Sequence, residues 1–126
     1  MINKEKLNGC TDKILNLADW LEGFGITEKL GELIITSGKR SVEDNAKIPN
    51  ASKTSLHTSG NAMDFTYKDT NIFKVVTPLF WYFLGNQGVF EGCTQFEVCR
   101  DANGTQHIHL GFGKESVKIS FTGTYK

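Results

Sequence analysis

Apolar and polar positions follow a helical period in the first part of the chain. Between 14 and 24 the apolar residues recur at steps of three and four, which places them on one face of a helix. Residues suited to capping flank this run: Thr11 or Asp12 at its start, and Gly23 or Gly25 at its end. The β-branched run at 33–36 predicts a buried strand, although it also fits the end of a helix that begins at Thr27.

Further along the chain, the apolar positions first alternate with period two, then follow a helical period, and finally form short apolar runs. Residues 62–67 alternate, which predicts a half-buried strand with Asp64 on its polar face. Apolar positions across 70–84 predict a helix, and Pro78 inside it means either a kink or a second helix capped by Thr77. Runs separated by glycine-containing turns then predict four strands: 88–91, 94–100, 106–112 and 117–122.

The runs at 94–100 and 106–112 also predict how they pair with each other. If both apolar faces lie on the core, the opposed residues are Phe96 with Leu110, Val98 with Ile108, Glu97 with His109, and Cys99 with His107. This register leaves 102–104 as a three-residue loop with Gly104 in the left-handed position. His107 and His109 then share one face at a separation of about 7 Å.

Composition narrows the class of protein. A chain of 126 residues forms a single domain, and 39% hydrophobic and 22% charged residues with zero net charge are ordinary for a soluble one. The charge gives no case for nucleic acid as a partner, and no apolar run is long enough for membrane insertion. The polar start 1–6 is not a signal peptide, so we expect cytoplasmic synthesis. The three cysteines, which lack C-x-x-C spacing, are expected to be buried or half-buried thiols: Cys10, Cys93 and Cys99.

Candidate chemistry gathers in two places. His57 and Asp64 lie in the stretch 55–64, and the other two histidines lie on the predicted strand 106–112. A mononuclear catalytic zinc site takes three ligands of these types and leaves a fourth position for water. Any one of these histidines, considered alone, is more often an ordinary surface or core residue than a metal ligand. The polar stretch after the strand 33–36 is long enough to be functional, and Arg40 within it can clamp a carboxylate.

Together these segments resemble the zinc D-Ala-D-Ala carboxypeptidases and the related peptidoglycan endopeptidases, whose fold is shared with lysostaphin-type peptidases and Hedgehog domains. The resemblance covers 30–112 and rests on these motifs: Ser37-Gly38-Lys39-Arg40-Ser41, Asn45, Ser55-x-His57-x-x-Gly60-x-Ala62-x-Asp64 and His107-x-His109. We therefore expect an α+β fold: a small antiparallel sheet of about four strands, helices packed on one face, and a zinc site in a cleft on the other.

The resemblance implies a role for each matching residue. It implies one Zn²⁺ per chain, held by His57, Asp64 and His109. His107 would lie beside the ion to stabilise an oxyanion or assist proton transfer, and Arg40 would bind a substrate carboxylate or carbonyl. Ser55 and Gly60 would shape the loop that presents His57.

Two positions depart from the family pattern. Lys39 stands where an aromatic residue is usual, and Gln106 stands where several members have a glutamate as general base. Glutamine cannot take a proton. The register argument offers Glu97 as the base instead, with His107 as the alternative, and two further acids are weaker candidates: Asp101 and Glu91.

The expected function is zinc-dependent hydrolysis of peptidoglycan stem peptides by a monomeric peptidase domain, 1–126, without a separate wall-binding domain. The bond is a terminal D-Ala-D-Ala bond, a cross-link or an L-Ala-D-Glu bond. Such a chain suits a phage or prophage lysis enzyme, or a component of a phage particle, which acts on the wall after release. One alternative is a non-catalytic zinc-binding module of the same fold, and Gln106 in the place of the usual general base supports it. A metal-dependent nuclease is the other, but no basic stripe supports it.

Overall fold

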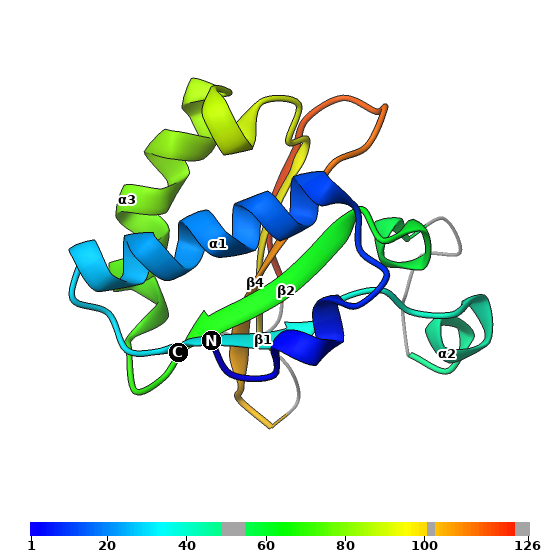
Figure 1. Ribbon diagram of the computed structural model, residues 1–126, viewed down its shortest axis with the longest axis horizontal. Helices are drawn as coiled ribbons and strands as arrows, with labels where there is room; N and C mark the ends of the chain where they lie inside the picture. Colours follow the sequence, from blue (N-terminus) through cyan, green and yellow to red (C-terminus); the bar gives the residue numbers. More distant parts are fainter. Residues whose placement is uncertain (49–54, 101–102, 123–126) are drawn as a thin grey trace.

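The computed structural model describes residues 1–48, 55–100 and 103–122, and within them the chain forms the expected α+β fold (Figure 1). Three α-helices accompany an open five-stranded sheet with the order β1-β2-β4-β3-β5. The strands are β1 Leu33–Ser37, β2 Ala62–Tyr67, β3 Gln95–Arg100, β4 Gln106–Gly111 and β5 Lys118–Thr122. The helices are α1 Asp12–Thr27, α2 Val42–Ala46 and α3 Ile72–Gly85, with 3-10 turns η1 Lys4–Leu7, η2 Leu56–Ser59 and η3 Gly88–Phe90.

The sheet is larger than expected and mixed. Pairs β1–β2, β2–β4 and β3–β4 are antiparallel, whereas β3 and β5 are parallel. Both edges of β4 are occupied, by β2 and β3, so the last strand cannot pair with β4 and instead joins the outer edge of β3. Because β5 runs opposite to β4, as β3 does, the new pair is parallel. The predicted hairpin register is confirmed at all four opposed pairs, and Gly104 has a positive φ of 82°.

Two predicted elements differ in the structure. Residues 88–91 do not form a strand, because Gly88 has φ 58° and the segment coils into η3, which buries Phe90. Thr11 is the N-cap of α1 as predicted, but the helix runs past both glycines to Thr27. Gly25 is there for packing, since a Cβ at that position would lie 2.6 Å from the Tyr67 ring.

Two open questions from the sequence are also answered. Residues 72–85 form a single helix, α3, with Pro78 inside it, so no second helix begins at Thr77. The polar stretch after β1 is not a plain loop, because it contains α2, which begins after the cap Ser41. The sequence also predicts turns at Pro49 and Asn50 within this stretch, but these two residues and part of the predicted hairpin loop lie outside the described residues.

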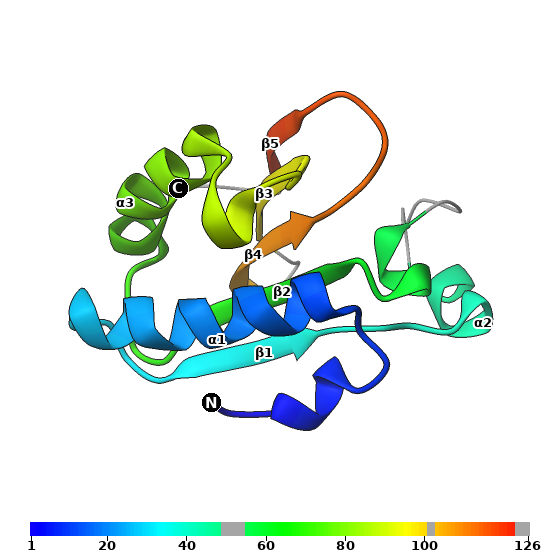
Figure 2. The same cartoon turned by 45° about the horizontal axis from the view of Figure 1, so that its top comes forward.

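Helices α1 and α3 lie on one face of the sheet, and the core fills the space between (Figure 2). Fully buried side chains from all three elements meet there: Leu17 and Leu21 of α1, Leu79 of α3, and Phe65, Phe96, Ile108 and Leu110 of the sheet. Since side chains alternate along a strand, the intervening residues Asp64, Glu97 and His109 point to the opposite face. The sheet therefore separates an apolar face from a polar one, which carries the candidate chemistry.

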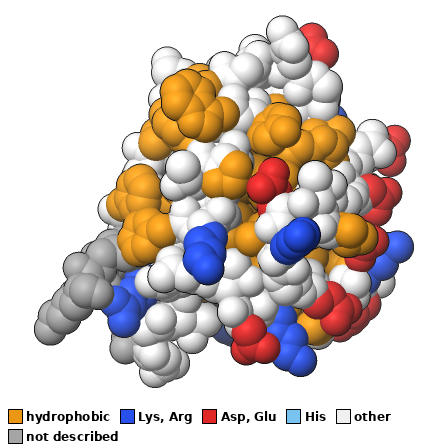
Figure 3. Space-filling view, turned by 90° about the vertical axis from the view of Figure 1, so that its left-hand side faces the viewer, with side chains coloured by type: hydrophobic (Ala, Val, Ile, Leu, Met, Phe, Trp, Pro, Cys, Tyr) orange, Lys and Arg blue, Asp and Glu red, His pale blue; other side chains and the backbone are white. Residues whose placement is uncertain are grey.

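Apolar side chains are also exposed in several places on the face shown in Figure 3, where no histidine appears. The exposed apolar residues of α3 are Phe73, Trp81, Tyr82 and Leu84. Among the described residues, no helix has the length and apolar character needed to cross a membrane.

Candidate metal centre

His57 is presented by a short turn that is fixed to the N-terminal part of the chain. The Ser55 hydroxyl accepts a hydrogen bond from the His57 backbone N–H at 3.3 Å, and Gly60, with φ 75°, is the C-cap of η2. The Gly60 carbonyl accepts a hydrogen bond from the Thr11 N–H at 3.0 Å. A Cβ at Gly60 would lie 2.7 Å from the Gly9 carbonyl oxygen, so only glycine allows this close packing.

Asp64 and His109 are placed opposite each other by the pairing of β2 with β4. Directly opposed residues on antiparallel strands have neighbouring side chains on one face of the sheet. η2 directly precedes β2, so the turn delivers His57 to the same place. Segments separated by more than forty positions in the sequence thus meet at one point.

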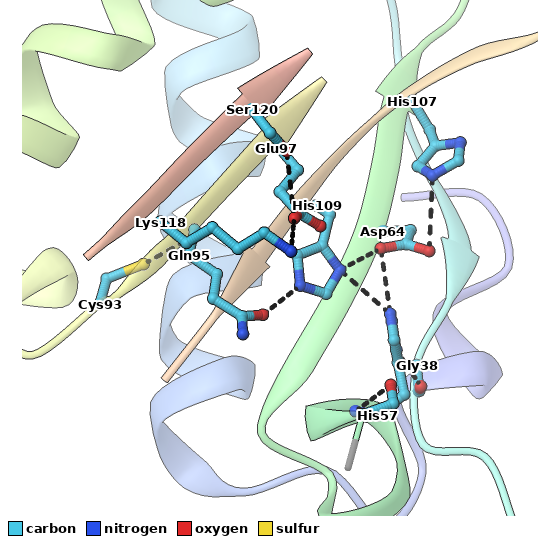
Figure 4. A network of polar contacts seen from close by, with 11 residues as sticks. Gly38, His57, Asp64, Cys93, Gln95, Glu97, His107, His109, Lys118 and Ser120 are labelled. Carbon is cyan, nitrogen blue, oxygen red and sulfur yellow. Dashed lines mark hydrogen bonds and ion pairs between the residues drawn. The ribbon is translucent and has the colours of Figure 1, made fainter. Parts of the chain in front are cut away.

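The three side chains form a compact cluster (Figure 4). Asp64 Oδ1 lies 3.1 Å from His57 Nε2 and 2.8 Å from His109 Nδ1, and the two nitrogens are 3.2 Å apart. Zinc bonds of about 2.0–2.1 Å in a tetrahedron separate two ligand atoms by about 3.3 Å, so this triangle needs little adjustment to hold the ion. The side chains of His57, Asp64 and His109 are only 2%, 13% and 10% exposed.

Both histidines are oriented by oxygen atoms outside the cluster. His57 Nδ1 lies 2.8 Å from the Gly38 carbonyl oxygen, and His109 Nε2 lies 2.7 Å from Gln95 Oε1. Since a carbonyl oxygen can only accept, each outer nitrogen carries the proton and donates it. The inner nitrogens are then free to bind a metal with their lone pairs, as is usual for metal-ligating histidines.

The electrostatics keep Asp64 ionised. Burial alone would raise its pKa, but the close contacts with His109 and His57 outweigh burial and hold the pKa of Asp64 well below its usual range. An ionised carboxylate and two neutral imidazoles are the protonation states that metal binding requires. The donor set therefore fits zinc in both geometry and charge.

Two predicted proton carriers lie close to this cluster. His107 Nε2 is 3.7 Å from Asp64 Oδ2, and its side chain is 24% exposed. Glu97 stands opposite His109 in the sheet, where Oε1 contacts Lys118 Nζ at 3.0 Å and accepts a hydrogen bond from Ser120 Oγ at 3.1 Å. Burial acts to raise the pKa of Glu97, but the contact with Lys118 prevails and lowers it.

The remaining predicted residues occupy different places. The Arg40 backbone N–H donates to the His57 carbonyl at 3.0 Å, which brings Arg40 beside the turn, and its Nε is buried without a hydrogen-bond partner in the described part of the chain. Gln106 lies at the start of β4, opposite Arg100. Glu91 lines a pocket together with Lys13 and Phe112, neither of which belongs to the cluster, whereas Asp101 lies outside the described residues.

Three residues of the site were missed by sequence reasoning. The carbonyl of Gly38 and the side chains of Gln95 and Lys118 hold His57, His109 and Glu97 respectively. The hairpin register contained the signal for Gln95, because this residue lies two positions before Glu97 and hence diagonal to His109. Nothing in the sequence pairs Lys118 with Glu97 until β5 is known to lie beside β3.

Comparison with known proteins agrees with this arrangement. The family model described as Peptidase M15 matches residues 2–110, which include the whole cluster. No match was found among curated proteins or among solved structures. A match over most of the chain, joined to a His-Asp-His cluster, shows that the chain belongs to the M15 family of zinc-dependent metallopeptidases.

Proposed function

We propose that this chain is a zinc peptidase that hydrolyses peptide bonds in the stem peptides of peptidoglycan. The observation that carries the proposal is the cluster of His57, Asp64 and His109, in which both outer imidazole nitrogens are already engaged by oxygen atoms. Family membership supports a cell-wall peptide as the substrate.

The residues of the cluster would hold the ion, and the polar side chains around it would handle substrate and protons. Bound zinc supplies a water of lowered pKa, about 7, and polarises a carbonyl group. Arg40 is the proposed partner of a substrate carboxylate or carbonyl, because a guanidinium binds such groups through two hydrogen bonds. Ser55 acts indirectly, since its hydroxyl holds the turn that presents His57.

Glu97 remains the proposed general base, and His107 is its competitor. Both project from the polar face of the sheet, where they flank His109. The lowered pKa of Glu97 keeps it ionised at neutral pH, so it can accept a proton, although a less basic carboxylate does so less readily. Glu97→Gln and His107→Gln, each assayed for kcat after zinc content is confirmed, would identify the base as the residue whose loss costs about 10²-fold or more.

Hydrolysis of purified peptidoglycan tests the function directly. We expect release of soluble fragments by the zinc-loaded protein, and loss of that activity after chelation and in His57→Ala. Glu115→Ala, which changes an exposed residue of the β4–β5 connection, serves as the control. A protein that binds zinc but leaves peptidoglycan intact would instead be the non-catalytic module that Gln106 keeps in consideration.

The finer assignment concerns the bond and the setting. We propose a D-Ala-D-Ala, cross-link or L-Ala-D-Glu bond, and a role in phage or prophage lysis or in a phage particle, with a monomer as the acting species. Mass spectrometry of products from a defined muropeptide distinguishes the three bonds, since each leaves fragments of different mass.

A further inference from the structure

The two ring nitrogens of His109 have different surroundings. Nδ1 faces the cluster, 2.8 Å from Asp64 Oδ1, whereas Nε2 faces away from it, 2.7 Å from Gln95 Oε1 (Figure 4). A histidine can bind a metal through either nitrogen, and the hydrogen bond made by the other one selects which. The amide oxygen of Gln95 can only accept, so it favours the tautomer with the proton on Nε2.

Gln95 reaches this ring because the residue opposite it in the sheet is a glycine. β3 and β4 pair Gln95 with Gly111, and the side chain then crosses diagonally to His109, two positions along β4. A Cβ on Gly111 would lie 2.9 Å from Gln95 Oε1 and 3.4 Å from His109 Nε2. The missing side chain at Gly111 thus leaves the space in which the hydrogen bond forms.

The other histidine of the cluster is held differently. His57 Nδ1 donates to the backbone carbonyl of Gly38, so its acceptor is not a side chain. His109 depends instead on one neutral side chain that belongs to neither the cluster nor the proposed proton carriers. Its orientation is therefore the part of the site that a single residue controls.

We propose that Gln95 is a positioning residue that fixes His109 as a ligand through Nδ1, and that Gly111 makes room for it. This inference rests on the metal site of the proposed function. Without the amide oxygen, the Nε2–H tautomer loses its acceptor while Asp64 still attracts a proton to Nδ1. Before zinc can bind, that proton must leave Nδ1 and the ring must be held in place.

The experiment measures zinc affinity and the His109 tautomer in variants of Gln95. Zinc dissociation constants come from competition with a chromophoric chelator, and the tautomer of zinc-free protein comes from long-range ¹H–¹⁵N NMR of the imidazole rings. Gln95→Met keeps the length of the side chain without an acceptor, and Gln95→Asn keeps the amide but is one methylene too short. Gln95→Glu retains an acceptor at the same reach. Gln87→Met changes an exposed glutamine as the matched control.

We expect Gln95→Met and Gln95→Asn to weaken zinc binding by about 10–100-fold, the usual effect of losing such a partner, and to shift the proton of His109 from Nε2 to Nδ1. Gln95→Glu and Gln87→Met should stay within about threefold of the unmodified protein. Thermal unfolding without zinc shows whether each variant is folded.

The inference would be overturned if a folded Gln95→Met or Gln95→Asn variant bound zinc within about twofold of the unmodified protein and kept Nε2 of His109 protonated. The proposed function would still stand in that case. If the unmodified protein binds no zinc, the metal site itself fails, and the inference with it. If Gln95→Met does not fold, Gln95→Asn and Gln95→Glu decide between the two outcomes.

Discussion

His57, Asp64 and His109 each use one polar atom for the cluster and another for a neighbouring group. Asp64 contacts both ring nitrogens through Oδ1 and approaches His107 through Oδ2. Glu97 follows the same principle, since Lys118 from β5 holds its Oε1. The protonation of these groups is therefore set by neighbours, and single substitutions among the neighbours should be measurable as changes in titration.

Replacement of Lys118 tests this at Glu97. Lys118→Met removes the strongest of the contacts that lower the pKa of Glu97. Burial, which raises this pKa, and the weaker influences of His109 and Ser120, which lower it, remain, so the pKa should rise towards its ordinary 4.5. A lowered carboxyl pKa gives stability that is present above pH 4.5 and is lost as the pH falls through the folded-state pKa. The variant should lose this acid sensitivity, with a change of at most about 1 kcal/mol because Lys118 is 65% exposed.

The measurement is the ¹³C titration of the Glu97 carboxyl group, together with unfolding at pH 3 to 7. Lys114→Met, an exposed lysine of the β4–β5 connection, is the control. Identical titration curves for Glu97 in both variants would show that Lys118 does not set this pKa.

Among the elements, the hairpin of β3 and β4 was predictable, because its apolar positions alternate and because the matching of apolar faces and the turn agree on one register. The β3–β4 register followed from matching the apolar faces Phe96–Val98 and Ile108–Leu110, and the structure has it. η3 was mistaken for a strand, because its two apolar residues, Val89 and Phe90, carry no period and Gly88 allows a positive φ. The same β3–β4 register places Gln95 opposite Gly111 and diagonal to His109, but the role of Gln95 was missed because it depends on the space that Gly111 leaves free. The place of β5 depends on which sheet edge is free, which no local pattern records.

The strand β3 connects the core to the site, and Phe96 is its anchor. Its ring lies between two rings of α3, 5.3 Å from Phe80 and 5.2 Å from Phe83, and is fully buried. Phe96→Ala should cost about 3–5 kcal/mol, a large part of the 5–15 kcal/mol typical of a domain. Chemical denaturation checks this, with Trp81→Ala, 71% exposed on the same helix, expected to change stability by less than about 1 kcal/mol. Equal losses would mean that α3 does not pack on β3 as described.

On the scale of the whole molecule, the N-terminal segment supports the loops that carry the site. Ile2 bonds to both neighbours of Ile34 in β1, through N–H to Leu33 at 2.8 Å and through its carbonyl to Ile35 at 3.0 Å. The segment then passes so close to Gly38 that a Cβ there would lie 1.9 Å from the Lys6 carbonyl oxygen. Since the Gly38 carbonyl orients His57, a contact outside the site is transmitted to a proposed metal ligand.

Gly38→Ala tests whether this support matters for metal binding. The new methyl group must push the backbone of Lys6 and that of Gly38 apart, which moves the carbonyl away from His57 Nδ1. We expect zinc affinity to fall by at least tenfold, as for other losses of a partner to a ligating histidine. Because zinc bound only to the folded state raises stability by RT ln(1 + [L]/Kd), a tenfold weaker Kd removes about 1.4 kcal/mol of that gain, or several degrees in Tm.

Gly23→Ala is the matched control, since a Cβ at this position of α1 meets nothing within 4 Å and alanine favours a helix interior. Its Tm should rise slightly without zinc, and its zinc-dependent gain should equal that of the unmodified protein. Gly38→Ala should lose Tm both without zinc and in the gain on adding zinc. A loss confined to the zinc-free protein would show that the N-terminal segment stabilises the fold without orienting His57, and would leave the cluster to be held by β2, β4 and η2 alone.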